Sequence, residues 1–495
     1  MPKIIPLVSH GSSIMSSSSH LNPEKMEIRN ILGINPGSVN QDRLPIPPLG
    51  ILYVAAYARK HGYNQWRIVD NDVIENRPVD GFSEDIAWAD IVTLTGTTAQ
   101  SKQAMQIAAL AKKMGKLVVY GGPHATPTWK QTLEMSEVDI VARGEGEVTF
   151  LELLDALREG RDLYSVDGLA FRDANGIPVK TKPRHRNFSL DEIPFPARDL
   201  VPVEQYGNKP LVRFSTNERY AHLIMTRGCT DKCEFCNTPN NWGGPVARSA
   251  ENLFAEMMEI YEKYGIKYFH FQDDVFTVNQ EIVRSLCYLL IEVRLRRQSK
   301  ISFEWSCLVR PDQVNYELLC LMKLAGCVQV EMGVESGSEE LLATARKRYT
   351  RDIIKQGVEN AKRAGILVYA FFIVGLPGET MDTWRQTVRF AKELNPDGSV
   401  WTVLTPYPGT EIYEKREMFE RQNIMKILNP DWTSWLYKTP VVQVGDLTPN
   451  MLLRMRNVAN RIVNGPSYKG AYRLEAIEYD KIISKKSIPT KEVVS

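Results

Sequence analysis

Between residues 28 and 160, short apolar runs rich in β-branched residues alternate with segments whose apolar positions recur at helical spacing. This alternation is typical of a parallel sheet covered by helices, the doubly wound, Rossmann-like arrangement of the α/β class. One expected helix follows Pro48 and covers Leu49–Ala56, and another runs through Ala104–Ala111. The expected strands are Ile28–Ile34, Trp66–Asp70, Asp90–Thr95, Leu117–Tyr120 and Asp139–Val141.

Each of these strands ends in a polar or glycine-rich turn. In an open parallel sheet, the turns at the carboxyl ends of the strands line one crevice, and ligands bind there. The dinucleotide fingerprint Gly-x-Gly-x-x-Gly does not follow the first strand, which disfavours NAD as that ligand. The five turns are Asn35–Gly37, Asp70–Asp72, Thr95–Thr98, Gly121–His124 and Arg143–Glu147.

The alternation of strands and helices returns between residues 216 and 415, where it predicts six further units. Polar side chains again follow several of the strands, so a second site is expected at the carboxyl edge of this sheet. The expected strands are His222–Thr226, Tyr268–Gln272, Ser302–Cys307, Gln329–Val334, Val368–Val374 and Ser399–Leu404.

The remaining segments have other compositions. The stretch between the two α/β regions is rich in Pro and charge, and it predicts a linker with one hairpin across Arg172–Ile177. The carboxyl-terminal part predicts a small, mainly helical region whose aromatic residues, Trp432, Trp435 and Tyr437, either close over a bulky substrate or form a core. The expected division is a flexible segment 1–27, a first domain 28–160, a linker 161–215, a second domain 216–415 and a helical region 416–495.

Composition narrows the class of protein. A chain of 495 residues with 43% hydrophobic and 24% charged residues is too long for one core and has the balance of a soluble globular protein. Its 61 basic and 59 acidic side chains nearly cancel, and no basic patch indicates a nucleic acid partner. The Ser-rich run Ser12–Ser19 lacks the apolar core of a signal peptide, and Ile366–Val374 is too short to span a membrane. We therefore expect no transmembrane segment and a cytoplasmic location.

Three cysteines, Cys229, Cys233 and Cys236, lie on one short loop after the first strand of the second domain. Thiolate is the soft ligand that iron–sulfur clusters prefer, and three on one loop can hold three corners of a cubane, leaving one iron open to a small molecule. A structural zinc site normally needs four protein ligands, and no second pair or nearby His supplies the rest. Seven sparse cysteines disfavour disulfides. The other four, which are expected in the core, are Cys287, Cys307, Cys320 and Cys327.

This loop, Cys-x3-Cys-x-Phe-Cys with Phe235 as its aromatic residue, resembles the signature of the radical S-adenosylmethionine (SAM) enzymes. The resemblance implies a partial (β/α)6 barrel and a 4Fe-4S cluster held by the three cysteines. The amino and carboxylate groups of SAM would chelate the open iron, and cleavage of SAM would give a 5'-deoxyadenosyl radical.

The first domain resembles the cobalamin-binding domain that precedes many radical SAM barrels, on the strength of Pro47–Tyr57, Gly121–Thr126 and Val141–Glu147. The motif Asp-x-His-x-x-Gly is absent, so the resemblance implies cobalamin without a histidine ligand from that motif. The alternative interpretation of His124 is a turn residue. That of Glu147 is a negative charge that stabilises the amino end of the following helix. The cobalamin-binding positions implied are Thr97, Thr98, Gly121, Gly122, His124, Gly144 and Glu145.

The resemblance also implies a SAM-binding neighbourhood at the carboxyl ends of the barrel strands. The alternative role of Asp273 and Asp274 is helix capping. The alternative role of Glu335 is a structural ion pair. Arg310 is expected either to pair with a carboxylate of SAM or substrate or to form an ion pair at the surface. The SAM-binding positions implied are Phe235, Asp273, Glu335, Ser336 and Gly375.

Together these resemblances imply an anaerobic, cobalamin-dependent radical SAM C-methyltransferase. The deoxyadenosyl radical would remove hydrogen from an unactivated carbon, methylcobalamin would supply the methyl group, and a second SAM would restore it. The expected partners are a bulky, apolar small-molecule substrate and an electron donor such as flavodoxin or ferredoxin. The preferred substrate is a bacteriochlorophyllide (tetrapyrrole), methylated on a side chain. Open alternatives are an oxidative cyclase, a hopanoid, phosphonate or peptide methyltransferase, and a non-catalytic cobalamin or iron–sulfur sensor.

Overall fold

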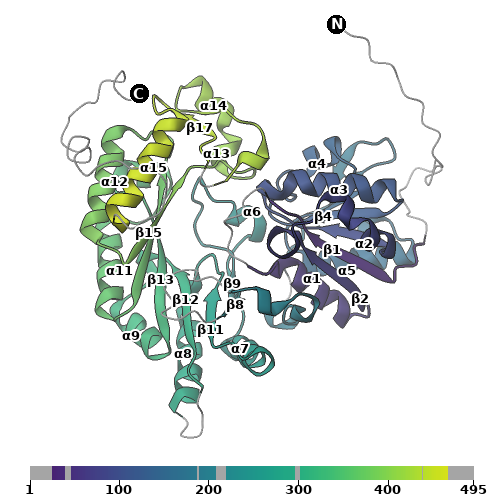
Figure 1. The fold of residues 1–495 in the computed structure, drawn as a ribbon, viewed down its shortest axis with the longest axis horizontal. Helices are drawn as coiled ribbons and strands as arrows, with labels where there is room; N and C mark the ends of the chain where they lie inside the picture. The colour runs from purple at the N-terminus through teal and green to yellow at the C-terminus, as the bar shows by residue number, and fades with distance from the viewer. Residues whose placement is uncertain are drawn as a thin grey trace.

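Two β-sheets, one mostly and one wholly parallel, lie side by side with their helices in the computed structural model (Figure 1). The structure describes residues 25–38, 46–186, 189–207, 219–295, 301–436 and 439–465. Most of the expected flexible segment 1–27, as well as Tyr437, therefore lies outside the described residues. No helix in this described part is long and apolar enough to cross a membrane.

The first sheet confirms the doubly wound arrangement. Its strand order is β2-β1-β3-β4-β5-β6-β7, and the pairs from β2 to β5 are parallel. Neighbouring residues of one strand face opposite layers: Ile31 packs among residues of α1 and α5, whereas Leu32 packs among residues of α2, α3 and α4. The elements are β1 (Asn30–Asn35), α1 (Leu49–Lys60), β2 (Gln65–Asp70), α2 (Ser83–Trp88), β3 (Ile91–Leu94), α3 (Ser101–Lys113), β4 (Leu117–Gly121), α4 (Trp129–Met135), β5 (Ile140–Ala142) and α5 (Gly146–Glu159).

The expected linker 161–215 is wrong for residues 169–180, which form two strands that extend the first sheet. Strands β6 (Leu169–Arg172) and β7 (Pro178–Lys180) continue the sheet beyond β5, each antiparallel to its neighbour. The hairpin expected across Arg172–Ile177 is therefore confirmed, but it belongs to the first domain. The reason is local burial, because Leu169, Ala170 and Phe171 are buried beside β5 although Pro and charged residues surround them.

The second sheet has six parallel strands in the order β15-β14-β13-β12-β11-β8, so consecutive strands are always neighbours. Helices lie along its outer side, giving an open, partial barrel (Figure 1). The elements are β8 (Tyr220–Leu223), α7 (Ala250–Tyr264), β11 (Tyr268–Phe271), α8 (Gln280–Leu295), β12 (Glu304–Val309), α9 (Tyr316–Leu324), β13 (Cys327–Glu335), α10 (Glu339–Thr344), α11 (Arg351–Arg363), β14 (Leu367–Val374), α12 (Met381–Leu394) and β15 (Gly398–Val403).

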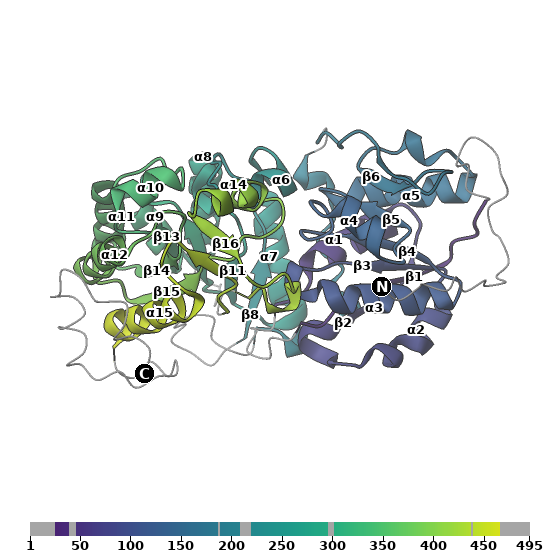
Figure 2. The same cartoon turned by 90° about the horizontal axis from the view of Figure 1, so that it is seen from above.

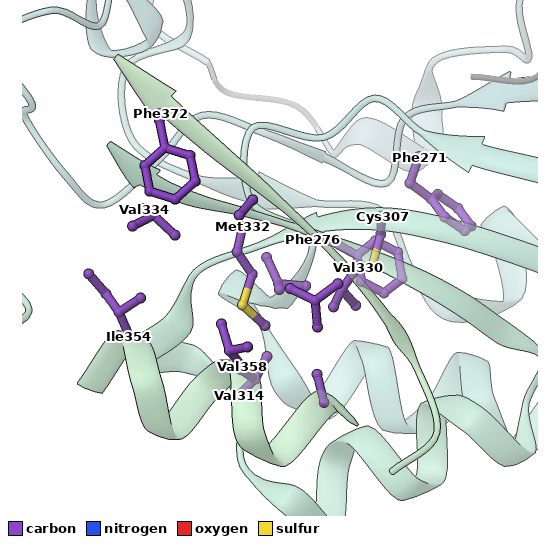
Figure 3. Close-up of a cluster of buried hydrophobic side chains, with 14 of the residues drawn as sticks. Phe271, Phe276, Cys307, Val314, Val330, Met332, Val334, Ile354, Val358 and Phe372 are labelled. Atoms are coloured by element: carbon purple, nitrogen blue, oxygen red, sulfur yellow. The ribbon is translucent and has the colours of Figure 1, made fainter. Parts of the chain in front are cut away.

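The outer face of the barrel strands is packed against these helices. Figure 3 shows strand residues such as Met332 and Phe372 above Ile354 and Val358 of α11. Successive side chains of a strand alternate between faces, and along β14 every second residue is fully buried while Tyr369, Phe371 and Ile373 between them stay partly exposed. The inner face of the barrel is thus left for other contacts.

The carboxyl-terminal region contains a small hairpin as well as helices. Helix α15 packs along β15 (Figure 2), and its Arg456 donates a hydrogen bond of 2.8 Å to the carbonyl oxygen of Trp401. Trp435 is buried in the main core, while Trp432 contacts the first domain, as described below. The elements are α13 (Glu411–Glu414), α14 (Arg416–Arg421), β16 (Met425–Ile427), β17 (Val442–Val444) and α15 (Pro449–Asn464).

The packing of the outer face predicts the effect of a core truncation. Phe372 is fully buried and stacks on Trp401 with ring centroids 4.2 Å apart. We expect Phe372→Ala to lower the stability of the barrel domain by about 3–5 kcal/mol, because it removes this contact and leaves a cavity. Tyr288→Ala, at a position that is 60% exposed, is the control and should shift the urea midpoint little. Equal shifts for both variants would contradict this packing.

Candidate functional site

The three loop cysteines lie at the carboxyl end of the first barrel strand. Their loop runs from β9 (Thr226–Arg227) to α6 (Thr238–Trp242), directly after β8. The loop folds on itself, because the amide of Cys236 donates a hydrogen bond of 3.0 Å to the carbonyl oxygen of Cys233. Backbone amides also approach two sulfurs: that of Asp231 lies 3.4 Å from Cys229 Sγ, and that of Thr238 lies 3.5 Å from Cys236 Sγ.

The donor chemistry of this loop fits a cluster better than a single ion. Within the described ranges, no three His, Cys, Asp or Glu side chains lie close enough to share one metal ion. In a cubane each thiolate binds a different iron, so its three sulfurs stand farther apart than the ligands of one ion. All three cysteines are free, and burial raises the pKa of Cys233 to about 11 and also raises that of Cys236. Such thiols become thiolates when a cation binds them.

Two neighbouring aspartates after β11 hold the loop in place. Asp273 is buried and accepts hydrogen bonds from the backbone amides of Met225 and Thr226, just before the loop. Asp274 accepts one from the amide of Gly228 (3.1 Å) and one from the hydroxyl of Thr238 (2.8 Å), so it joins the two ends of the loop. Burial raises the pKa of Asp273 to about 7. Its predicted contact with SAM stays a prediction, since both of its oxygens are occupied by the protein.

The loop's own acidic side chains are paired with cations from other elements. Asp231 forms a buried ion pair with Arg310, which follows the third barrel strand and also binds Asp312 at 2.6 Å. Glu234 accepts a hydrogen bond of 2.8 Å from Lys415 of the carboxyl-terminal region. Arg310 thus pairs with side chains of this chain, but the pair is buried rather than at the surface as expected, and a contact with SAM or substrate stays a prediction. The loop is tied to two further parts of the chain.

Glu335 and Phe235, both predicted to bind SAM, meet at Lys347. Glu335 lies at the end of β13 with a positive φ of 63°, a backbone conformation that is uncommon outside glycine and frequent at functional sites. Its carboxylate lies 2.9 Å from the ammonium of Lys347, which stands 5.3 Å from the centre of the Phe235 ring. Burial alone would lower the pKa of Lys347, but the charge of Glu335 raises it well above its usual value. Lys347 is therefore a charged neighbour of the cysteine loop.

Ser336 and Gly375, the other predicted SAM positions, have partners within the protein. The hydroxyl of Ser336 lies 3.0 Å from that of Thr387 in α12 and accepts a hydrogen bond from the amide of Ser338. The amide of Gly375 donates to the buried carboxylate of Glu379. Their contact with SAM stays a prediction, and in the structure these polar groups are hydrogen-bonded to other groups of the protein.

Several predicted cobalamin positions meet where β3 and β4 end. The imidazole of His124 is buried, and its Nδ1 lies 3.2 Å from the hydroxyl of Thr98. Burial lowers the pKa of His124 to about 4, so the ring is neutral at pH 7. Gly122 has a φ of +94°, and a Cβ there would lie 2.7 Å from Thr95 Oγ1, so only glycine allows this approach of two loops. Gly121 is the last residue of β4.

The carboxyl-terminal region reaches the same crevice edge. The ring of Trp432 meets that of His124 edge-on, with centroids 4.7 Å apart. Thr97, also predicted to bind cobalamin, is exposed beside them and begins the short helix that contains Thr98. The crevice edge is thus formed by two loops of the first domain together with a residue from the far end of the chain.

Gly144 and Glu145, the last two predicted cobalamin positions, lie in the turn between β5 and α5. The amide of Gly144 donates a hydrogen bond of 3.0 Å to the hydroxyl of Thr126. Glu145 forms a bidentate pair with Arg186, with distances of 2.7 and 2.8 Å, and lies 3.1 Å from Arg227 beside the cysteine loop. Its carboxylate therefore connects the two domains, and its contact with cobalamin stays a prediction.

Sequence reasoning missed Arg227 and Lys347. A charged residue beside a cysteine loop is unremarkable in a sequence, because nothing local says that it is buried. The only signal was the presence of opposite charges at distant turns, Glu145 and Glu147 for Arg227 and Glu335 for Lys347.

Comparison with known families agrees with both halves of the fold. The profile of the radical SAM superfamily matches residues 223–391, and that of the B12-binding domain matches residues 39–154. An uncharacterised methyltransferase of Pyrococcus horikoshii is 32% identical over 428 residues, covering 83% of this chain and 86% of the relative. The anaerobic magnesium-protoporphyrin IX monomethyl ester cyclase of Rubrivivax gelatinosus is 29% identical, covering 78% and 70%.

A solved structure shares the fold. The radical SAM methyltransferase TsrM from Kitasatospora setae superposes with a TM-score of 0.66 at 20% identity, covering 79% of this chain and 76% of that protein. The chain belongs to the cobalamin-binding radical SAM family, as one of its methyltransferases. The cofactors of this family are a 4Fe-4S cluster, SAM and cobalamin.

Asp274 is hydrogen-bonded to both ends of the cysteine loop, so its removal is predicted to lower the affinity for the cluster. Asp274→Ala frees both the start and the end of the cysteine loop, so we expect it to weaken cluster binding by about 10-fold or more. Iron and sulfide per chain after anaerobic reconstitution measure this loss. The control is Asp382→Ala, which removes an exposed carboxylate on α12 that pairs only locally. Full cluster content in Asp274→Ala would contradict the bridge.

Glu379 predicts a pH dependence of stability. Burial raises its pKa from the usual 4.5 to about 8, so the folded protein holds a proton that the unfolded chain releases above pH 4.5. The contribution of Glu379 to the free energy of unfolding is therefore most favourable at low pH. It falls as pH rises from 4.5 to about 8, by up to about 1.4 kcal/mol per pH unit. The uncharged variant Glu379→Gln should remove this slope. Chemical denaturation of both proteins at several pH values measures the difference, and identical slopes would contradict it.

Proposed function

We propose that this methyltransferase acts on an unactivated carbon of a bulky, apolar small molecule, with a tetrapyrrole side chain of the bacteriochlorophyllide type as the best candidate. The observation that carries the proposal is the ion pairing between the cysteine loop and the β5–α5 turn. It places the turn of the cobalamin-type domain directly against the cluster-type loop, so one substrate can lie between both cofactor sites.

The reaction needs the two sites to act on one carbon. When bound, the cofactors supply a carbon radical that removes hydrogen and a methyl group that replaces it. The chain's own residues orient the parts: Asp273 and Asp274 fix the cysteine loop, and Lys347 with Glu335 provides paired charges at the barrel mouth. Buried His124 stays neutral and holds the turn after β4 through Thr98. Positioning of this kind is what a reaction between bound partners requires.

The part of the inner barrel face formed by β14 and β15 supports a bulky, apolar substrate, whereas β11, β12 and β13 contribute the buried polar side chains His270, Ser306 and Glu331. The side chains of β14 that do not pack on the helices, Tyr369, Phe371 and Ile373, are only partly buried. Those of β15 include the partly exposed Val400 and Thr402. Apolar and aromatic walls of this kind bind flat, apolar molecules, with a few polar groups fixing the orientation.

The named relatives include tetrapyrrole enzymes, although the cytidylyl-2-hydroxyethylphosphonate methyltransferase of Streptomyces wedmorensis is also 29% identical, over 447 residues and 79% of this chain. Besides the cyclase from Rubrivivax gelatinosus, the bacteriochlorophyllide d C-12(1)-methyltransferase of Chlorobaculum tepidum is 26% identical over 376 residues, 74% of this chain. The cyclase also supplies the second candidate function, ring formation on a tetrapyrrole. In either case an electron must reach the cluster, and a small donor such as flavodoxin or ferredoxin fits that need.

Anaerobic turnover tests the proposal. Protein with reconstituted cluster and cobalamin, given SAM, a reductant and bacteriochlorophyllide d, should form methylated pigment, deoxyadenosine and S-adenosylhomocysteine. Cys229→Ser should abolish deoxyadenosine, whereas Cys320→Ser, at a cysteine outside the loop, should not. Deoxyadenosine without S-adenosylhomocysteine would favour the cyclase.

The substrate has its own test. Pigment mass profiles of the host, with and without the protein, should differ by methyl groups. Unchanged pigments would contradict the tetrapyrrole assignment while leaving methyl transfer to another apolar substrate open to the turnover assay.

A further inference from the structure

Arg227 lies two residues before Cys229, and its side chain leaves the barrel for the first domain. Its guanidinium lies 2.6 Å from Glu147 and 3.1 Å from Glu145. Only 5% of the Arg227 side chain is exposed, against 4% for Glu147 and 10% for Glu145. One cation of the barrel is thus buried against two carboxylates of the other domain.

Aromatic rings from both domains enclose this guanidinium. It stands 5.1 Å from the ring centre of Tyr53 in α1 and 5.2 Å from that of Trp242 in α6. Both distances are within the range of cation–π attraction. Figure 1 shows α6 and β9 lying between the two sheets, in keeping with a contact that joins them. Arg227 is therefore held from two sides and has little freedom to change direction.

A second arginine, Arg186, follows strand β7 and binds one of the same carboxylates. Arg186 binds Glu145 and also donates hydrogen bonds to the carbonyl oxygens of Trp242 (3.0 Å) and Gly244 (3.4 Å). Glu145 is in this way shared between Arg186 and Arg227. The turn after β5 consequently contacts both the start of the cysteine loop and the segment that follows it.

We infer that Arg227 is a positioning residue that fixes the cysteine loop relative to the cobalamin-binding edge of the first domain. The inference rests on the proposed function. Glu145 lies in the turn at the carboxyl end of β5 and Glu147 in the first turn of α5 that follows it, at the edge where ligands of an open parallel sheet bind. A planar guanidinium bound to two carboxylates sets direction as well as distance. Hydrogen removal and methyl transfer at one carbon require that geometry, and displacements of the order of 1 Å slow such reactions strongly.

The magnetic coupling between a reduced cluster and cob(II)alamin tests this role, because it depends on their separation and orientation. Arg227→Gln, loaded with both cofactors, should keep wild-type iron and cobalamin contents but show a broadened or reduced coupling in electron paramagnetic resonance spectra. Glu147→Gln should do the same more weakly, since Glu145 remains, and Arg227→Lys should lie between. Arg184→Gln is the matched control, since Arg184 pairs with Glu152 inside the first domain. It should leave the coupling unchanged.

Amide hydrogen exchange tests the contact in the cofactor-free chain. Arg227→Gln removes the arginine partner of the buried Glu147 carboxylate and one of the two arginines bound to Glu145, so residues 143–147 and 226–229 should exchange about tenfold faster or more. Unchanged exchange in both segments, or a wild-type coupling in Arg227→Gln, would overturn the inference. Failure of the proposed function looks different, because the wild-type chain itself would then bind no cobalamin or no cluster. If Arg227→Gln does not fold, the same comparisons are made with Arg227→Lys and Glu147→Gln.

Discussion

The structure depends on the burial of charge along one short loop. Between residues 227 and 236 the chain carries an arginine, two paired acidic side chains and three thiols, and most of these are withdrawn from water. A buried charge needs a partner at short range, and each partner here comes from a different element. Glu147, Arg310 and Lys415 belong to the first domain, the barrel and the carboxyl-terminal region. The position of the loop is therefore fixed from three directions.

The cysteine loop is therefore in contact with three separate parts of the chain. The loop carries the three cysteines, and its backbone is tied to the next strand by Asp273 and Asp274. The sheet that lies beneath is packed on its outer face by helices, while alternate side chains of β14 on its inner face stay partly exposed. A rigid sheet with a heavily anchored loop at its edge is how many α/β enzymes combine stability with a precise site.

Much of the fold could be predicted from the sequence, because both sheets are built from strongly apolar strands between helices of regular spacing. All eleven expected strands exist, with ends shifted by a few residues. The hairpin of β6 and β7 could be predicted from its turn, but its place in the first sheet could not, because pairing with β5 decides it. The three cysteines could be found from spacing alone. The partners of Glu145 and Ser336 could not, because Arg227 and Thr387 are close to them only after folding.

The edge-on contact of Trp432 with His124 joins residues that are far apart along the chain. A ribosome releases the first domain long before it makes Trp432, so that domain folds while this side of His124 is still open. Contacts of such large sequence separation form late and slow the last step of folding. The last neighbour of His124 at this edge therefore arrives only when translation is nearly finished.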